Sequence, residues 1–138
     1  TNPPDTLRKV VNISSISGIY GAATQLAYSS AKAAVVGMTK TLAREWGRYH
    51  VTVNCVAFGY IDTLLIEPFE DQPNQVTIKD RDHPVGLTAA QRESAKGMTA
   101  LGRLGRPEDA ANAVYLLCRP ESDFITGEVL VASGGLMN

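Results

Sequence analysis

The chain has 138 residues, of which 44% are hydrophobic and 20% charged, and its formal net charge is −1. That length suffices for one modest domain, and the composition is ordinary for a soluble globular protein. The near-neutral charge provides no basic field to attract nucleic acid. No apolar run approaches the roughly 20 residues that a membrane-spanning helix needs. Neither a nucleic acid nor a membrane is therefore expected as a partner.

The N-terminal residues lack the charged start and apolar stretch of a signal peptide, so a cytoplasmic location is expected. Cys55 and Cys118 have no metal-like spacing and stand among apolar residues. We expect both to be buried, reduced thiols. His50 and His83 have no acidic or cysteine partner at ligand spacing, so no metal site is predicted.

The first half of the chain predicts a strand, a loop, a long helix and a second strand. The β-branched run at 9–15 is typical of a buried strand that ends in hydroxyl residues, and the Gly- and Ser-rich residues 16–24 predict a loop. Apolar residues at helical spacing predict a helix from about 25 to 47. The nearly continuous apolar segment 51–57 is typical of a parallel strand covered on both faces.

In the second half, residues 66–86 are polar, contain three prolines and show no strong periodicity, which predicts a loop. A weak helical pattern follows at 88–99. Pro107, with acidic residues directly after it, predicts the start of a helix over 107–118. A last strand is expected at about 128–132. Alternating strands and helices predict parallel βαβ units and an α/β fold.

Tyr28 and Lys32 are four residues apart in the predicted long helix and therefore share one face. An ammonium beside a phenol favours the phenolate, so such a pair can exchange a proton with a carbonyl oxygen. The spacing alone is weak evidence, because it occurs by chance in many proteins. Ser15 strengthens it, since the carboxyl ends of parallel strands line the ligand crevice of open α/β sheets. A hydroxyl there can hydrogen-bond the oxygen that the tyrosine protonates.

Together with other motifs, Ser15, Tyr28 and Lys32 make the sequence resemble the short-chain dehydrogenases/reductases. The resemblance extends over nearly all of the chain after residue 8. Each matching motif is modest, but together they follow the family's order and spacing. The matching segments are Asn12–Ser15 with Gly18, Tyr28–Lys32, Thr39–Glu45, Val53–Ala57 followed by Gly59, Ile61 and Thr63, then Leu101–Arg103, Gly105, Pro107–Asp109 and Ile125–Gly127.

The resemblance implies a role for each site residue. Tyr28 would be the general acid for reduction and the general base for oxidation, and Ser15 would hold the substrate oxygen. Lys32 would assist Tyr28 and bind the nicotinamide ribose, and Tyr28 would itself also contact the cofactor. Ile61 would contact the carboxamide through its backbone, and Thr63 would bind near the carboxamide or the pyrophosphate. Gly59 belongs to the same cofactor-side segment.

The resemblance also implies a fold, the C-terminal half of a Rossmann-like doubly wound parallel sheet with α/β/α layers. Residues 1–138 would form the C-terminal part of a single domain, in which 64–100 is the substrate loop or lid. The Gly-rich phosphate-binding turn and the residue that distinguishes NAD from NADP are not found in these residues. We therefore expect that the isolated 138 residues do not bind the cofactor measurably and are inactive. Phe58 and Ser133 depart from the family pattern, which has proline and aspartate there.

The implied activity is NAD(P)-dependent hydride transfer to or from a carbonyl or alcohol. The motifs look most like those of 3-oxoacyl-[acyl-carrier-protein] reductases of fatty acid metabolism, so a 3-oxoacyl thioester is the expected substrate. Two alternatives remain, a non-catalytic assembly or scaffold segment and an epimerase or dehydratase on the same scaffold. The many small residues of the 25–47 helix suit close core packing, a subunit interface or both. By resemblance, a homodimer or homotetramer is expected.

Overall fold

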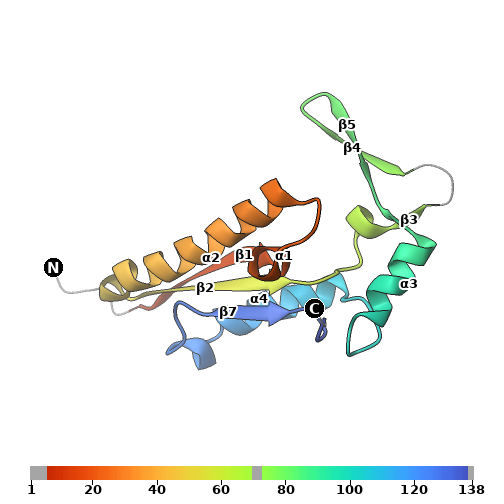
Figure 1. The fold of residues 1–138 in the computed structure, drawn as a ribbon. Helices are drawn as coiled ribbons and strands as arrows, with labels where there is room; N and C mark the ends of the chain where they lie inside the picture. The colour runs from red at the N-terminus through yellow and green to blue at the C-terminus, as the bar shows by residue number, and fades with distance from the viewer. Residues whose placement is uncertain (1–5, 70–72, 137–138) are drawn as a thin grey trace.

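The structure, a computed structural model, describes residues 6–69 and 73–136. A parallel sheet is its centre, with strand order β1-β2-β7. β1 (Arg8–Ser15) pairs with β2 (Val51–Phe58) along its whole length, and β2 also pairs with β7 (Val129–Ala132). All three strands point the same way, so their carboxyl ends lie at one edge of the sheet (Figure 1). The predicted parallel α/β fold is confirmed.

Helices cover both faces of this sheet. On one face, α2 (Leu26–Trp46) packs against β1 and β2, and Asn12 of β1 donates a hydrogen bond to Thr39 of α2 at 3.0 Å. On the other, α4 (Pro107–Cys118) packs Ala113 and Leu117 against Val56 of β2. Successive residues of a strand face opposite sides, so β2 is buried by both helices. Its six central residues are all buried, as the apolar run predicts.

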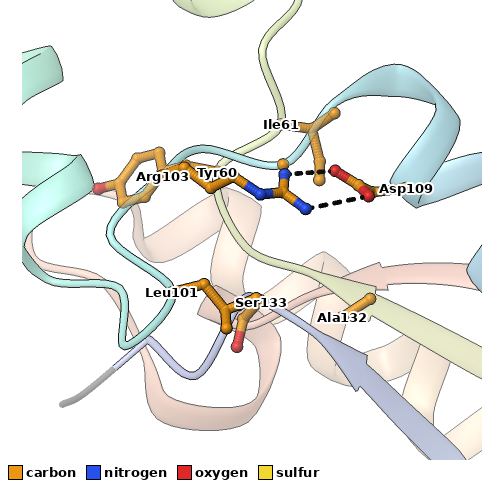
Figure 2. A pocket seen from close by; sticks show the side chains of 9 residues that line it. Tyr60, Ile61, Leu101, Arg103, Asp109, Ala132 and Ser133 are labelled. Carbon is orange, nitrogen blue, oxygen red and sulfur yellow. Dashed lines mark hydrogen bonds and ion pairs between the residues drawn. The ribbon is translucent and has the colours of Figure 1, made fainter.

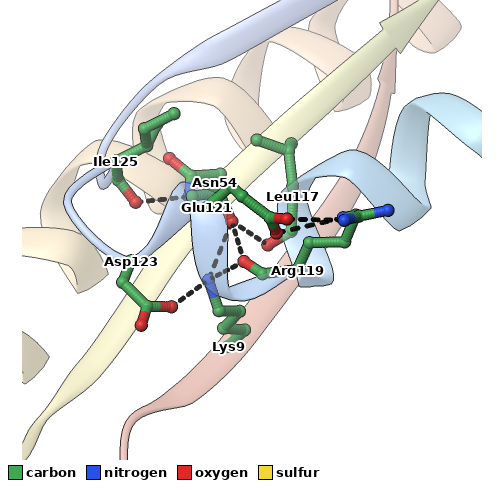
Figure 3. Close-up of polar contacts among 8 residues, drawn as sticks. Lys9, Asn54, Leu117, Arg119, Glu121, Asp123 and Ile125 are labelled. Atoms are coloured by element: carbon green, nitrogen blue, oxygen red, sulfur yellow. Dashed lines mark hydrogen bonds and ion pairs between the residues drawn. The ribbon is translucent and has the colours of Figure 1, made fainter.

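A short helical segment after α4, η3 (Pro120–Ser122), is joined to the start of β1 (Figure 3). Lys9 donates hydrogen bonds of 2.7 Å to the carbonyl of Arg119 and to the hydroxyl of Ser122, and it pairs with Asp123 at 2.7 Å. Ser122 is itself buried. These contacts hold the connection between α4 and β7 against the amino end of the sheet, away from the carboxyl ends of the strands.

The segment between β2 and α4 contains more regular structure than predicted. Where a loop was expected at 66–86, β4 (Asn74–Ile78) and β5 (Arg81–Val85) form an antiparallel hairpin that projects from the rest of the fold (Figure 1). Lys79 and Asp80 both have positive φ angles, 50° and 59°. This left-handed pair makes the tight turn that joins twisted strands. Neither residue is the glycine that usually signals such a turn, and residues 70–72 of the expected loop lie outside the described residues.

Short elements complete this region. β3 pairs with β6 in parallel, and α3 follows directly behind a capping box in which Thr88 and Gln91 exchange hydrogen bonds. The predicted loop at 16–24 contains one helical turn, α1, close to α2. The bounds of these elements are α1 Ser17–Tyr20, η1 Gly47–Tyr49, η2 Leu64–Ile66, β3 Pro68–Phe69, β6 Leu87–Thr88 and α3 Ala89–Gly97.

The two cysteines differ in environment. Cys55 is buried in β2, as expected, but Cys118 at the end of α4 is exposed, so the expectation of burial was wrong for Cys118. Among the described residues, no helix is both long and apolar enough to cross a membrane. Within the same residues, no group of three or more His, Cys, Asp or Glu side chains is placed to hold a metal ion.

Candidate active site

Ser15 is the last residue of β1 and lies at the carboxyl edge of the sheet, opposite Phe58 of β2. The residue is 9% exposed. Its hydroxyl oxygen accepts a hydrogen bond of 3.2 Å from the backbone N–H of Ser17, at the start of α1. A hydroxyl has one donor and two acceptor positions, so Ser15 can still donate its proton to a ligand oxygen.

Tyr28 lies in the first turn of α2, and Lys32 lies one turn further along the same helix. The Lys32 Nζ atom is 5.7 Å from the centre of the Tyr28 ring. Tyr28 is 47% exposed, so its side chain is accessible to a ligand. The structure therefore brings the two predicted residues together on one helix face, as their spacing indicates.

Two hydrogen bonds join this turn of α2 to the end of β1. Lys32 donates from Nζ to the carbonyl of Ile13 at 3.2 Å, and the buried Ser14 hydroxyl donates to the carbonyl of Lys32 at 2.8 Å. Ile13 and Ser14 directly precede Ser15. The strand end that presents Ser15 is thus joined to the helical turn that carries Lys32, although one residue comes from β1 and the other from α2.

After β2, residues 60–62 run beside Gly105. Gly105 donates its N–H to the carbonyl of Tyr60 at 2.9 Å, and Asp62 donates its N–H to the carbonyl of Gly105 at 2.7 Å. In an extended segment, alternate residues direct their backbone groups to opposite sides. The N–H and C=O of Ile61 therefore point away from Gly105, where a ligand can reach them.

The predicted Thr63 follows directly in an extended conformation and is exposed. Its carbonyl accepts the N–H of Ile66 at 2.9 Å, which closes the short turn η2. Sequence reasoning missed a neighbour of this turn. Arg92 of α3 donates to the carboxylate of Asp62 and to the carbonyl of Ile66. The guanidinium holds the pKa of Asp62 below its usual value, chiefly through that hydrogen bond.

A family model described as "Enoyl-(Acyl carrier protein) reductase" matches residues 5–137. The chain belongs to the short-chain dehydrogenase/reductase family. It is 37% identical to the 3-oxoacyl-[acyl-carrier-protein] reductase FabG of Thermotoga maritima over 128 residues, which cover 93% of this chain and 45% of FabG. The FabG of Vibrio cholerae is equally similar, with 37% identity and the same coverage. The resemblance inferred from the sequence motifs is confirmed.

Other members of the family are also similar to the chain. A (2S)-[(R)-hydroxy(phenyl)methyl]succinyl-CoA dehydrogenase subunit, BbsD of Thauera aromatica, is 39% identical over 92% of this chain and 44% of its own. The solved structure of 4-hydroxyisoleucine dehydrogenase complexed with NADH superimposes with a TM-score of 0.70 and 27% identity, covering 94% of this chain and 46% of that one. The chain thus spans a little under half the length of the short-chain dehydrogenases/reductases it matches.

The two departures from the family pattern lie close to each other. Phe58 packs beside the core residue Val56, and its carbonyl accepts the N–H of Ile16 at 3.0 Å. Gly59 follows it and donates to the carbonyl of Ala132 at 3.1 Å. A Cβ atom on Gly59 would lie 2.8 Å from the Cβ of Ser133. Any side chain at 59 would therefore displace the turn after β7, so Gly59 allows the two strand ends to approach.

Two cavities border this edge of the sheet. One, of about 140 Å³, is bordered by the segments at the ends of β2 and β7 and by the Arg103–Asp109 ion pair, and Ile61 lines it (Figure 2). Neither this cavity nor the second is lined by Ser15, Tyr28 or Lys32. The other, of about 340 Å³, lies between α1, Tyr60 and the end of α3. We call it the α1–α3 cleft. Its lining is mixed, with somewhat more apolar than polar surface, and includes Ile16, Met98 and Leu136 together with the tyrosines Tyr20 and Tyr60.

Proposed function

We propose that this chain carries the acid–base residues and the nicotinamide-side loop of an NAD(P)-dependent oxidoreductase that interconverts a carbonyl and an alcohol. One observation carries the proposal: the turn of α2 that holds Lys32, one turn after Tyr28, is hydrogen-bonded to the strand end that presents Ser15. This places a phenol, an ammonium and a hydroxyl on joined elements beside the carboxyl ends of parallel strands, where ligands of open α/β sheets bind.

The donors present suit a nicotinamide nucleoside. An ammonium has three N–H donors, and the bond from Lys32 to Ile13 uses one, so Lys32 can also donate to ribose hydroxyls. The outward-facing N–H and C=O of Ile61 match the acceptor and donor of a carboxamide, and the exposed Thr63 offers a hydroxyl nearby. The cofactor would supply or accept the hydride. Both NAD and NADP remain compatible with these groups.

The side chains would handle the substrate oxygen and its proton. Tyr28 would give its hydroxyl proton to the carbonyl oxygen during reduction and take it back during oxidation. The Lys32 ammonium would stabilise the phenolate that results, since opposite charges that lie close together attract. Ser15 would donate a hydrogen bond to the same oxygen and so fix its position. These residues orient the substrate and move one proton.

The α1–α3 cleft would take the body of the substrate. Its apolar side chains suit an acyl or other apolar chain, because burial of apolar surface favours binding. We propose a 3-oxoacyl thioester, reduced to the 3-hydroxyacyl product, which agrees with the names of the FabG relatives. Residues 64–100 would form the substrate loop, and the protein would act as a homodimer or homotetramer.

The Tyr28→Phe variant tests the function in the protein that carries this chain. Loss of the phenolic proton should lower turnover by about 10²–10⁴-fold and leave cofactor affinity nearly unchanged. Tyr49→Phe is the matched control, because Tyr49 is also about half exposed but lies at the amino end of β2. Full activity in Tyr28→Phe would contradict the acid–base role. Turnover without a net change in nicotinamide absorbance would indicate an epimerase or dehydratase, and no turnover with any carbonyl substrate would favour a scaffold.

A further inference from the structure

The guanidinium of Arg92 contacts both ends of the turn that contains Thr63. Nη2 donates to the Asp62 carboxylate, and Nη1 donates to the Ile66 carbonyl at 3.2 Å. Only 18% of the Arg92 side chain is exposed, although its partner Asp62 is 43% exposed. A planar guanidinium has several donors in a fixed geometry, so it can hold two acceptors at a set separation.

The Asp62 end of this arrangement is held independently of Arg92. Asp62 donates its own N–H to Gly105, which in turn bonds to Tyr60. The Ile66 end has no such support from Gly105. It belongs to η2, whose own hydrogen bonds are Ile66 to Thr63 at 2.9 Å and a longer one, Glu67 to Leu64, at 3.4 Å. From outside the turn, Gly86 donates its N–H to the carbonyl of Leu65 at 3.1 Å, and Leu87 donates to the carbonyl of Glu67 at 3.4 Å. Leu64 and Leu65 within the turn are mostly exposed, so packing contributes little to its position.

Arg92 also stands on the helix that borders the α1–α3 cleft. The first turn of α3 is fixed by the Thr88–Gln91 capping box, and β6 pairs with β3 just before it. Met98, directly after α3, lines the cleft together with Tyr60. One side chain therefore connects the helix beside the cleft to the turn that presents Thr63.

From these contacts we propose that Arg92 is a positioning residue that fixes the Thr63 turn from both ends and couples it to the cleft-lining helix α3. The inference rests on the proposed function, in which Thr63 lies beside the cofactor and the cleft takes the substrate. Arg92 does not line the cleft and would contact neither ligand itself. Without it, the turn and α3 would be joined only through the short β3–β6 pair and the backbone hydrogen bonds beside it, and both ligands would meet a less ordered site.

Hydrogen exchange tests the positioning role without any ligand. In the protein that carries this chain, Arg92→Met should speed exchange at least about fivefold in peptides covering 62–67, because the turn opens more often. Arg81→Met is the matched control, since Arg81 is an exposed arginine of the neighbouring hairpin. Arg92→Lys should give an intermediate rate, because a lysine can pair with Asp62 but cannot span both acceptors. Exchange at 62–67 that is unchanged in Arg92→Met would overturn the proposal.

Steady-state kinetics provide the second readout. Arg92→Met should raise KM for both cofactor and substrate about tenfold and change kcat less than threefold, with partial rescue in Arg92→Lys. A tenfold loss in kcat with unchanged KM values would overturn the positioning role. If Arg92→Met does not fold, the Arg92→Lys exchange rates and KM values decide. The exchange experiment does not depend on turnover. If the parent protein is inactive with every nicotinamide cofactor, the proposed function is refuted, and the exchange rates alone then test the positioning role of Arg92.

Discussion

Gly18 of α1 lies directly against the backbone of Lys32 in α2. A Cβ atom at residue 18 would be 2.6 Å from the Lys32 carbonyl carbon and 2.8 Å from the nitrogen of Ala33. These atoms are backbone, so they cannot turn aside as the end of a long side chain can. The helical turn that carries the predicted catalytic lysine is therefore packed from one side by α1 and bonded to β1 through Ser14 and Ile13.

The first prediction concerns Gly18→Ala. The added methyl group should push α1 away from α2 or displace the Lys32 turn, which we expect to lower the free energy of unfolding by about 1–3 kcal/mol. Displacement of Lys32 should also reduce turnover. Denaturant unfolding and steady-state rates of the two proteins provide the measurement.

Gly37→Ala is the matched control for this substitution. Gly37 is likewise a helical glycine, in α2, but a Cβ atom there would meet nothing within 4 Å. Alanine in a helix interior is more favourable than glycine, so this variant should be about 0.5–1 kcal/mol more stable. Equal stability changes in the two variants would show that the close approach at Gly18 does not matter.

The sequence predicts the sheet and its helices well because burial imposes strong patterns. β2 is covered on both faces and has a nearly continuous apolar run, and α4 begins at a proline followed by acids. The β4–β5 hairpin has neither signal. It projects from the fold, its outer residues are exposed, and its turn uses Lys79 and Asp80 in place of glycine. No strong burial pattern and no Asn-Gly or Asp-Gly pair therefore marks it in the sequence.

The site residues, too, can be predicted from the sequence only where a regular element places them. Tyr28 and Lys32 are recognisable because a helix brings residues four apart together, and Ser15 because a strand ends there. The Arg92–Asp62 contact joins residues 30 positions apart through a turn of irregular shape, so no local pattern indicates it. Cys118 was misjudged for a related reason. Apolar neighbours in sequence do not imply burial, since residue 118 is not on the helix face that buries Ala113 and Leu117.

The second prediction follows from the different exposure of the cysteines. Burial raises the pKa of the Cys55 thiol, so little thiolate forms there near neutral pH, whereas Cys118 is exposed. A thiol reagent applied to the native protein should modify Cys118 quickly and Cys55 only after unfolding. Within this chain, Cys118→Ser should remove the fast reaction, as mass spectrometry of the labelled peptides would reveal. Rapid native labelling of Cys55 would contradict its buried position.

The third prediction concerns Lys9, whose side chain is 13% exposed and bonds to the segment after α4 (Figure 3). Lys9→Met keeps most of the aliphatic stem but removes the donors to Arg119 and Ser122. Hydrogen bonds from charged groups contribute about 1.5–3 kcal/mol each, so we expect a loss of about 2–3 kcal/mol in unfolding free energy. Lys40→Met, an exposed position of α2, is the control and should change stability by less than about 0.5 kcal/mol. Similar values for both variants would rule out the proposed stabilisation.

The last prediction is a pH dependence that arises at Asp109, in the first turn of α4 (Figure 2). Arg103 donates to both oxygens of this carboxylate, at 2.6 and 3.2 Å, and the Arg106 N–H donates to it at 2.7 Å. These donors, the Arg103 guanidinium first among them, lower the pKa of Asp109 from 3.8 to about 2. The folded protein therefore keeps the carboxylate ionised at a pH where the unfolded chain has begun to bind a proton.

The sign of the effect follows from that difference. A depressed carboxyl pKa contributes stability that is fully present above the unfolded value of 3.8 and is lost as the pH falls towards about 2. Asp109→Asn removes this titration, so its unfolding free energy should fall less steeply than that of the parent protein over this range. Glu108→Gln, the neighbouring exposed acid, is the control and should leave the slope close to that of the parent. Denaturant unfolding at several pH values below about 5 measures the slopes, and identical slopes for Asp109→Asn and the parent would exclude Asp109 as the titrating group.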